Sequence, residues 1–209
     1  MPDNMSEERK KTLQFYGAEL IEVEAGNFDA AIELRDKLCE ENDWFNCNQF
    51  GDALNIDSHY YTTGPEILAW AFENRFQIDA IVTGTGTGGT LMGLHKRIKP
   101  QFPNMKMIAV EPKESAVMSG GEPGIHGIQG IGDGSKFLVD MDNVDWISVI
   151  STEDAKERAR RLAKEHGLFV GISAGANILA AERWIEEVKP KNQVVTFLCD
   201  RGDRYFSCL

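Results

Sequence analysis

Gly84-Thr85-Gly86-Thr87-Gly88-Gly89-Thr90 is the stretch of this sequence that decides the fold. The apolar residues 78–82 before it are typical of a buried parallel strand, and residues 91–97 after it are typical of a helix. A glycine turn between a strand and a helix presents the free N–H groups and the positive dipole end of the first helical turn. Such turns bind phosphate, and the threonines add hydroxyl donors. The sequence therefore predicts a phosphate cradle in the 84–90 loop.

The composition is that of an acidic globular protein. Among the 209 residues, 42% are hydrophobic and 26% are charged, and the net charge is -11. This charge argues against nucleic acid or an anionic membrane as a partner. No apolar run reaches the roughly 18 residues of a membrane span, and the N-terminus lacks the pattern of a signal peptide. We therefore expect a cytoplasmic protein with no nucleic-acid or membrane partner.

The cysteines and histidines show no metal-binding pattern. No CxxC pair occurs, and a chain of this size does not need disulfide bonds for stability. The histidines likewise lack the spacing of metal ligands. We expect no metal site from these eight residues, which are Cys39, Cys47, Cys199, Cys208, His59, His95, His126 and His166.

Strand-like and helix-like segments alternate along the chain, which predicts an α/β fold with a doubly wound parallel sheet. The expected strands are residues 19–23, 78–83, 105–110, 146–150, 168–171 and 194–198. The expected helices are residues 6–16, 28–41, 65–74, 89–99, 153–166 and 175–188.

The loop-rich segment 44–59 is the predicted domain boundary, with a small domain at residues 1–47 and a large one at 48–209. Residues 113–143 carry many glycines and are expected to form a long functional loop. Ligands of doubly wound sheets bind at the carboxyl ends of the strands. The loops 84–90, 171–176 and 199–204 are expected to meet there.

Two kinds of phosphate ligand fit the cradle. Gly84, Gly86 and Gly89 satisfy the dinucleotide pattern G-x-G-x-x-G, and Glu111 follows where a ribose-binding carboxylate belongs. However, the dense threonines suit a terminal phosphomonoester better than a pyrophosphate. A second turn of small residues, 171–176, also places Ser173 where it could contact a ring nitrogen, which a dinucleotide does not require. An NAD-binding domain thus remains the less favoured alternative.

Several motifs, in this order along the chain, together resemble one enzyme family. They are Met1-Pro2-Asp3-Asn4-Met5-Ser6, Tyr16-Gly17-Ala18-Glu19-Leu20, Thr62-Thr63-Gly64-Pro65-Glu66-Ile67, the 84–90 loop, Val110-Glu111-Pro112, Ser119-Gly120-Gly121 with Gly127-Ile128-Gln129-Gly130-Ile131-Gly132, the 171–176 turn, and Cys199-Asp200-Arg201-Gly202-Asp203-Arg204-Tyr205. The sequence resembles the cysteine synthase (O-acetylserine sulfhydrylase) group of fold-type II pyridoxal-phosphate enzymes over nearly its whole length. The resemblance implies a tryptophan synthase β-like fold in which residues 1–47 are the remainder of the small, mobile domain.

The resemblance also implies roles for individual residues. The cofactor phosphate would be held by Gly86, Thr87, Gly88, Gly89 and Thr90. Ser173 would contact the pyridine nitrogen, and a serine there leaves that nitrogen unprotonated, which suits β-elimination and replacement. The substrate cleft would be lined by Gly130, Ile131, Gly132 and Cys199. The implied reaction is the replacement of the acetoxy group of O-acetylserine by sulfide, or thiosulfate, to give cysteine.

One family element has no match in this sequence. The family's Schiff-base lysine lies in an N-terminal region that we do not find here, and Lys136 is not expected to replace it. We therefore expect no catalytic residue to be identifiable, and a chain that is a fragment or is inactive alone. Two functions stay open. One is a cysteine synthase of which this chain is the C-terminal two-thirds, and the other is a non-catalytic phosphate- or cofactor-binding module or partner protein.

Partners and subtype are also only implied. The family suggests a homodimer and docking of serine acetyltransferase. The run Cys199-Asp200-Arg201-Gly202-Asp203-Arg204-Tyr205 resembles the B-type enzymes that use thiosulfate, whereas the 127–132 loop resembles the A type. The subtype is left open.

Overall fold

Four parallel strands carry the phosphate loop in the computed structural model, which describes residues 1–209. They are β1 (Ile78–Gly84), β2 (Lys106–Pro112), β3 (Trp146–Ile150) and β4 (Gln193–Thr196). The order across the sheet is β3-β2-β1-β4, and every pairing is parallel. The chain thus adds strands on one side of β1 and then crosses to the other side. The predicted α/β fold with a doubly wound parallel sheet is confirmed.

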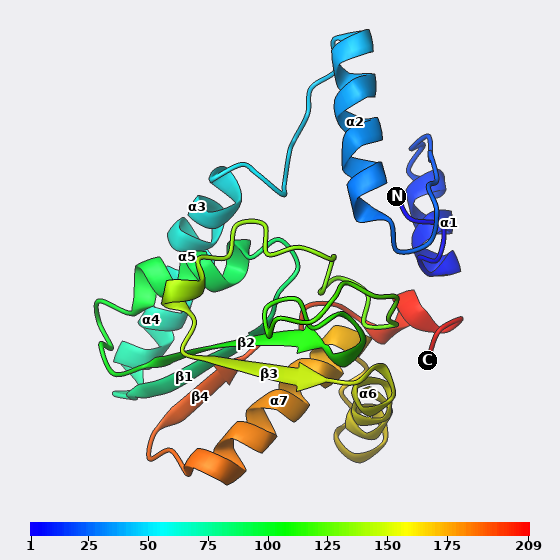
Figure 1. The fold of residues 1–209 in the computed structure, drawn as a ribbon. Coiled ribbons are helices and arrows are strands. Elements are labelled where there is room, and N and C mark those ends of the chain that lie inside the picture. The colour runs from blue at the N-terminus through cyan, green and yellow to red at the C-terminus, as the bar shows by residue number, and fades with distance from the viewer.

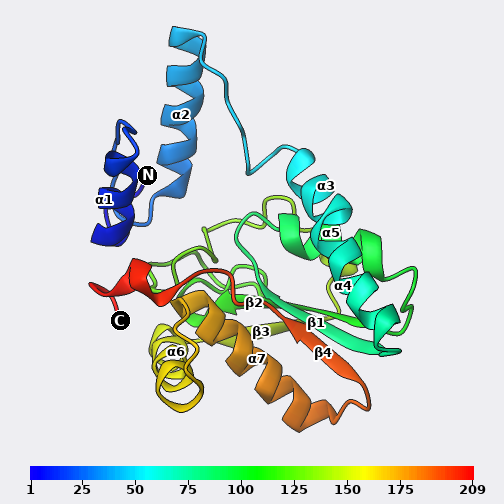
Figure 2. The same cartoon turned by 180° about the vertical axis from the view of Figure 1, so that it is seen from behind.

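Helices cover both faces of this sheet (Figures 1 and 2). One face is covered by α3 (Leu54–Tyr61), α4 (Thr63–Glu73) and α5 (Gly89–Ile98), and the other by α6 (Thr152–His166) and α7 (Ile172–Val188). The side chains of β1 alternate accordingly. Ile81 belongs to the core cluster with α4 and α5, whereas Ala80 and Val82 belong to the cluster with α7. No helix combines the length and the apolar character needed to cross a membrane.

The first two helices stand apart from the sheet (Figure 1). Helix α1 (Glu7–Phe15) and helix α2 (Phe28–Asn42) contain no buried residue, and an extended connection leads from α2 to α3. The C-terminal 3-10 helix (Gly202–Tyr205) lies beside α1, where the Glu8 carboxylate accepts hydrogen bonds from the amide and hydroxyl of Ser207 at 2.9 and 2.7 Å. The domain boundary between residues 47 and 48 stays a prediction.

Two short predicted strands were wrong. Residues 19–23 form no strand, because only Val23 finds a bridge partner, which is Pro2. Residues 168–171 likewise contribute one antiparallel bridge, between Val170 and Arg201. A strand needs a neighbour along its length, and these two segments lack one.

The helices also differ from the sequence prediction: one was missed, and α4 begins at Thr63 rather than at residue 65. The segment 44–59, predicted as a loop, contains most of α3. Helix α7 begins at Ile172 rather than at residue 175, because Gly171 serves as its N-cap residue and the small side chains after it let the first turn pack tightly. A Cβ atom at Gly175 would lie 2.2 Å from the carbonyl oxygen of Ala155, which shows how closely α7 approaches α6. Ser173 is therefore inside the first helical turn.

Candidate functional site

The loop between β1 and α5 presents a set of unpaired backbone donors. The N–H groups of Gly86, Thr87, Gly88, Thr90 and Leu91 donate to no acceptor within the protein. They surround the positive dipole end of α5, whose N-cap residue Gly88 has a φ of +89°. This loop lies at the carboxyl end of β1, beside β4, where the strand order reverses and where doubly wound sheets bind ligands. The geometry is that of an anion site.

Close packing explains two of the glycines in this loop. A Cβ atom at Gly86 would lie 2.9 Å from the carbonyl oxygen of Gly130, and one at Gly88 would lie 2.6 Å from Cγ2 of Val139. Side chains at these positions would push the loop away from its supports. The two glycines therefore keep the backbone N–H groups in place.

The threonines of the loop have different tasks. Thr85 donates its hydroxyl hydrogen to the carbonyl of Val110 at 3.0 Å and thus ties the loop to β2. Thr87 accepts a hydrogen bond from the Asn55 side chain at 2.9 Å, and the Thr90 hydroxyl lies 3.1 Å from Nε2 of His59. Both partners belong to α3. Residues 44–59 were predicted to be a loop, so Asn55 and His59 were not recognised. Their spacing of four residues places them on one side only in a helix.

Ser173 faces the same cleft as the phosphate loop. The residue is buried, at 4% exposure, and it lines a cleft of about 430 Å³ at the carboxyl end of the sheet. Nine of the ten residues predicted for the site line this cleft, namely Gly86, Thr87, Gly88, Gly89, Thr90, Gly130, Ile131, Ser173 and Cys199. The tenth, Gly132, donates its N–H to the carbonyl of Thr85 at 2.8 Å and faces a neighbouring hollow.

The side chain of Ile131 contributes little to the cleft. It is 4% exposed and belongs to the core cluster under the sheet end, where a Cβ atom at Gly84 would lie 2.6 Å from its Cγ2. Ile131 therefore anchors the 130–132 loop through its side chain.

The Cys199 thiol lies in the cleft in its protonated form. Burial raises its pKa first, and the Asp200 carboxylate raises it further. The Asn177 side-chain amide donates to the sulfur at 3.7 Å. Since the thiolate is the reactive form of cysteine, this residue is suited to contact a ligand and not to attack it.

A chain of hydrogen-bonded side chains lines the cleft and begins on α1. Arg9 donates to the Tyr205 hydroxyl at 3.1 Å, and that hydroxyl donates to Asp200 at 2.5 Å. Asp133 lines the same cleft, and burial raises its pKa to about 6, although the Arg9 guanidinium acts in the opposite direction. Asp200 and Tyr205 belong to one sequence motif, but Arg9 and Asp133 come from distant segments of the chain, so their place in this group could not be predicted.

Glu111 does not serve a ribose. Its carboxylate is 2% exposed and accepts hydrogen bonds from the amides of Met118 and Ser119, at 2.7 and 2.9 Å, and from the Ser119 hydroxyl at 2.5 Å. These bonds hold the start of the 113–143 loop against β2. Glu111 was the carboxylate that favoured a dinucleotide, and its hydrogen bonds within the protein leave it unable to bind a ribose.

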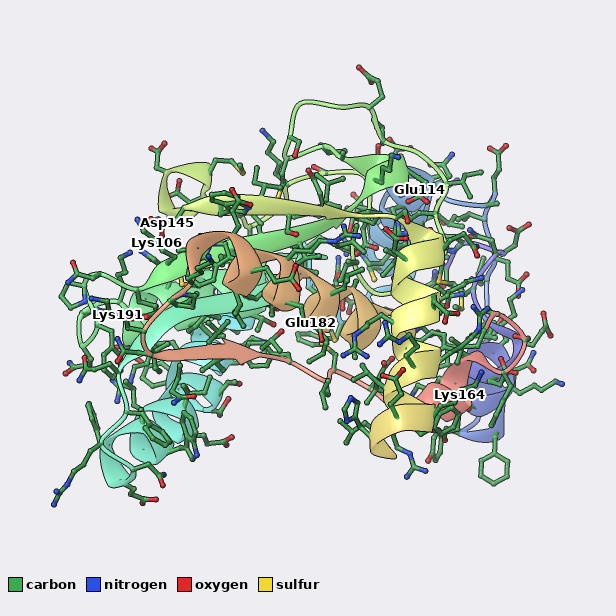
Figure 3. All side chains as sticks on the ribbon, turned by 90° about the horizontal axis from the view of Figure 1, so that it is seen from below. Lys106, Glu114, Asp145, Lys164, Glu182 and Lys191 are labelled. Carbon is green, nitrogen blue, oxygen red and sulfur yellow. The ribbon has the colours of Figure 1, made fainter.

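No lysine lines the cleft. Lys106 pairs with Asp145 at 3.0 Å and, like Lys191, lies at the amino ends of the strands, opposite to the cleft (Figure 3). Lys164 lies on the outer helix α6. Lys136 is exposed and borders a separate small hollow next to Glu111.

The donors of this site fit a phosphorylated pyridine. Five backbone N–H groups of one loop lack an acceptor within the protein, and a terminal phosphate with three acceptor oxygens can use several such donors. Across the same cleft, the Ser173 hydroxyl is a neutral hydrogen-bond partner for a ring nitrogen. The cleft volume of about 430 Å³ falls within the range of small-molecule sites.

Comparison with known proteins agrees with this fit. Residues 1–200 match the family model described as pyridoxal-phosphate dependent enzyme. The chain is 42% identical over 211 residues to a cysteine synthase of Staphylococcus aureus, covering 99% of this chain and 67% of that protein.

Solved structures give the same result. A hydrogen sulfide-producing enzyme from Fusobacterium nucleatum superposes with a TM-score of 0.91 at 37% identity, over 100% of this chain and 64% of that one. A cysteine synthase from Entamoeba histolytica superposes with a TM-score of 0.87 at 37% identity, over 100% of this chain and 62% of that one. The chain thus spans about two thirds of the length of these relatives. It belongs to the pyridoxal-phosphate dependent enzymes, within the cysteine synthase family.

Proposed function

We propose that this chain provides the cofactor-binding part of a pyridoxal-phosphate dependent cysteine synthase, which replaces the acetoxy group of O-acetylserine by sulfide. One observation carries this proposal: a loop of free N–H donors and the Ser173 hydroxyl face one cleft at the point where the strand order reverses. When bound, the cofactor stabilises negative charge at the substrate's α-carbon and so permits loss of the β-substituent.

The residues of this chain bind the cofactor and orient its ring. Gly86, Thr87, Gly88, Gly89 and Thr90 hold the phosphate at the start of α5. The Ser173 hydroxyl contacts the pyridine nitrogen without bringing a charge, so the ring nitrogen has no carboxylate to keep it protonated. This arrangement limits the withdrawal of electrons into the ring, which favours β-elimination and replacement over reactions that need a stronger electron sink.

The remaining side of the cleft would receive the amino-acid substrate. Gly130 and Ile131 line this side, Gly132 supports them through its hydrogen bond to Thr85, and Cys199 offers a protonated thiol beyond the end of β4. The sulfur donor in this proposal is sulfide or thiosulfate.

The base and covalent anchor of the cofactor would come from a complementing N-terminal piece, because no lysine of this chain lines the cleft. Residues 1–47 would then be the remainder of the small domain and residues 48–209 the large domain. A homodimer, docking of serine acetyltransferase and a cytoplasmic location belong to the same proposal. The absence of a lysine from the cleft also supports a second function, a cofactor-binding module without catalysis.

Borohydride reduction followed by mass mapping distinguishes these functions. The purified chain is incubated with pyridoxal phosphate, reduced, and digested, with and without a purified N-terminal piece of a relative. The proposal expects a labelled lysine on the added piece together with turnover of O-acetylserine. Cofactor binding without labelling or turnover in either case favours the module. Specific labelling of a lysine of this chain, together with turnover in the absence of the added piece, would contradict the proposal.

A further inference from the structure

Helix α3 packs directly on the phosphate loop and on α5 (Figure 2). A Cβ atom at Gly93 of α5 would lie 2.5 Å from the carbonyl oxygen of Ile56, so the two helix backbones are in contact. At Gly89, a Cβ atom would lie 1.9 Å from Oδ1 of Asn55. The glycines of α5 thus allow α3 to place two polar side chains, Asn55 and His59, behind the cradle.

The hydrogen bonds of Asn55 determine the direction of the Thr87 hydroxyl. Its amide nitrogen lies 2.8 Å from the carbonyl oxygen of Gln49 and 2.9 Å from Oγ1 of Thr87. A carbonyl can only accept, so this atom is the nitrogen, and both of its hydrogens are donated. Thr87 therefore accepts from Asn55, and also weakly from the Gly89 amide at 3.4 Å. The single hydroxyl hydrogen of Thr87 has no acceptor within the protein.

His59 stands in the same relation to Thr90. Its Nδ1 lies 2.9 Å from the Thr63 hydroxyl and its Nε2 lies 3.1 Å from the Thr90 hydroxyl. Burial lowers the His59 pKa, so the ring is neutral and carries one N–H. If Thr63 donates to Nδ1, then the Nε2–H group donates to Thr90. The Thr90 hydrogen is then also free to point into the cleft.

We propose that Asn55 and His59 are positioning residues that aim the hydroxyl hydrogens of Thr87 and Thr90 at the cofactor phosphate. This inference rests on the proposed function, because it presumes that a phosphate occupies the cradle. It adds two residues that touch neither the cofactor nor the substrate. It also predicts that phosphate selects the Nε2–H tautomer of His59.

Binding measurements on the full chain test the role of Asn55. The ligands are pyridoxal phosphate, pyridoxal without the phosphate, and inorganic phosphate. A net hydrogen bond to a charged group corresponds to roughly a tenfold change in affinity. We expect Asn55→Ala to weaken pyridoxal phosphate and inorganic phosphate about fivefold to tenfold and to leave pyridoxal unchanged.

Further variants separate positioning from general packing. Thr87→Val should weaken phosphate binding as Asn55→Ala does, whereas Thr87→Ser should retain it. The double variant Asn55→Ala/Thr87→Val should bind phosphate no more weakly than Thr87→Val alone, because both changes remove the same interaction. The exposed helix residue Asn42, which donates to the carbonyl of Leu38, provides the control variant Asn42→Ala with unchanged affinity. For His59, nitrogen NMR of the labelled chain with inorganic phosphate should show the Nε2–H tautomer.

The outcomes distinguish this inference from the proposed function. The proposed function would be contradicted if the wild-type protein did not bind inorganic phosphate and bound pyridoxal phosphate no more tightly than pyridoxal. Suppose instead that the wild type prefers the phosphate ligands. If Asn55→Ala then left their affinities unchanged, or weakened pyridoxal as much as pyridoxal phosphate, only the positioning role of Asn55 would be overturned. An Nδ1–H tautomer in the presence of phosphate would overturn the role of His59.

Discussion

Replacing Gly88 by alanine tests whether backbone geometry holds the phosphate loop. Gly88 has a φ of +89°, a conformation that costs an L-residue about 1–2 kcal/mol. The new Cβ atom would also lie 2.6 Å from Cγ2 and 2.9 Å from the backbone nitrogen of Val139. Overpacking of this kind costs about 1–3 kcal/mol. We expect Gly88→Ala to lower the free energy of unfolding by about 2–5 kcal/mol in all.

The neighbour at Gly88 has little room to move. Val139 is 9% exposed, and its N–H donates to the carbonyl of Lys136 at 2.9 Å. A shift of Val139 would break that hydrogen bond, whereas a shift of Gly88 would displace the first N–H groups of α5. Part of the strain should therefore appear as weaker binding of inorganic phosphate.

Gly167 offers a matched control for the conformational contribution. It has a φ of +68° at the end of α6, and a Cβ atom there would meet nothing within 4 Å. Gly167→Ala should cost only about 1–2 kcal/mol. Urea unfolding of both variants, followed by circular dichroism, gives the difference between them. If Gly88→Ala were no more destabilising than Gly167→Ala, the close packing of the loop on Val139 would be refuted.

Three more predictions concern the surroundings of the loop. Asn177→Ala should lower the free energy of unfolding by about 2–4 kcal/mol in urea melts, because the Gly84 amide and the Phe197 carbonyl lose their hydrogen bonds to the buried Asn177 side chain. A loss below about 1 kcal/mol would refute this role. Ser173→Ala should weaken pyridoxal phosphate about fivefold to tenfold with inorganic phosphate unchanged, in the same titrations; equal losses for both ligands would argue against a contact with the ring nitrogen. For Asp133, the folded-state pKa of about 6 exceeds the ordinary carboxyl value of 3.8, so the folded state binds more protons than the unfolded state. The free energy of unfolding therefore falls as pH rises from about 4 to 7, by less than about 3 kcal/mol because the carboxyl lines an open cleft. Asp133→Asn should flatten this pH dependence in urea melts, and an unchanged slope would contradict the assignment.

The phosphate loop could be predicted from sequence because its signals are local. An apolar run, a turn of glycines and an amphipathic segment each specify their own structure, and their order implies a parallel sheet with the loop at its carboxyl end. The predicted role of Ser173 depended on the resemblance to a family, since a serine in a turn of small residues more often has a structural role such as helix capping. The structure brings it to the same cleft as the loop.

The surroundings of the loop could not be predicted, because they depend on tertiary packing. Residues 44–59 are rich in asparagine, aspartate and glycine, which favour loops in isolation, and α3 forms there by packing on Gly93 of α5. The roles of Asn55 and His59 appear only once that helix is placed. Residues 19–23 show the opposite error, in which a strand-like pattern finds no neighbouring strand.

Phosphorus NMR of the chain titrated with pyridoxal phosphate tests the central claim most directly, with NAD as competitor. We predict one saturable, shifted phosphate resonance that Gly88→Ala weakens and NAD does not displace. A resonance that stays at its free position, or that NAD displaces stoichiometrically, would contradict a pyridoxal-phosphate cradle at the start of α5.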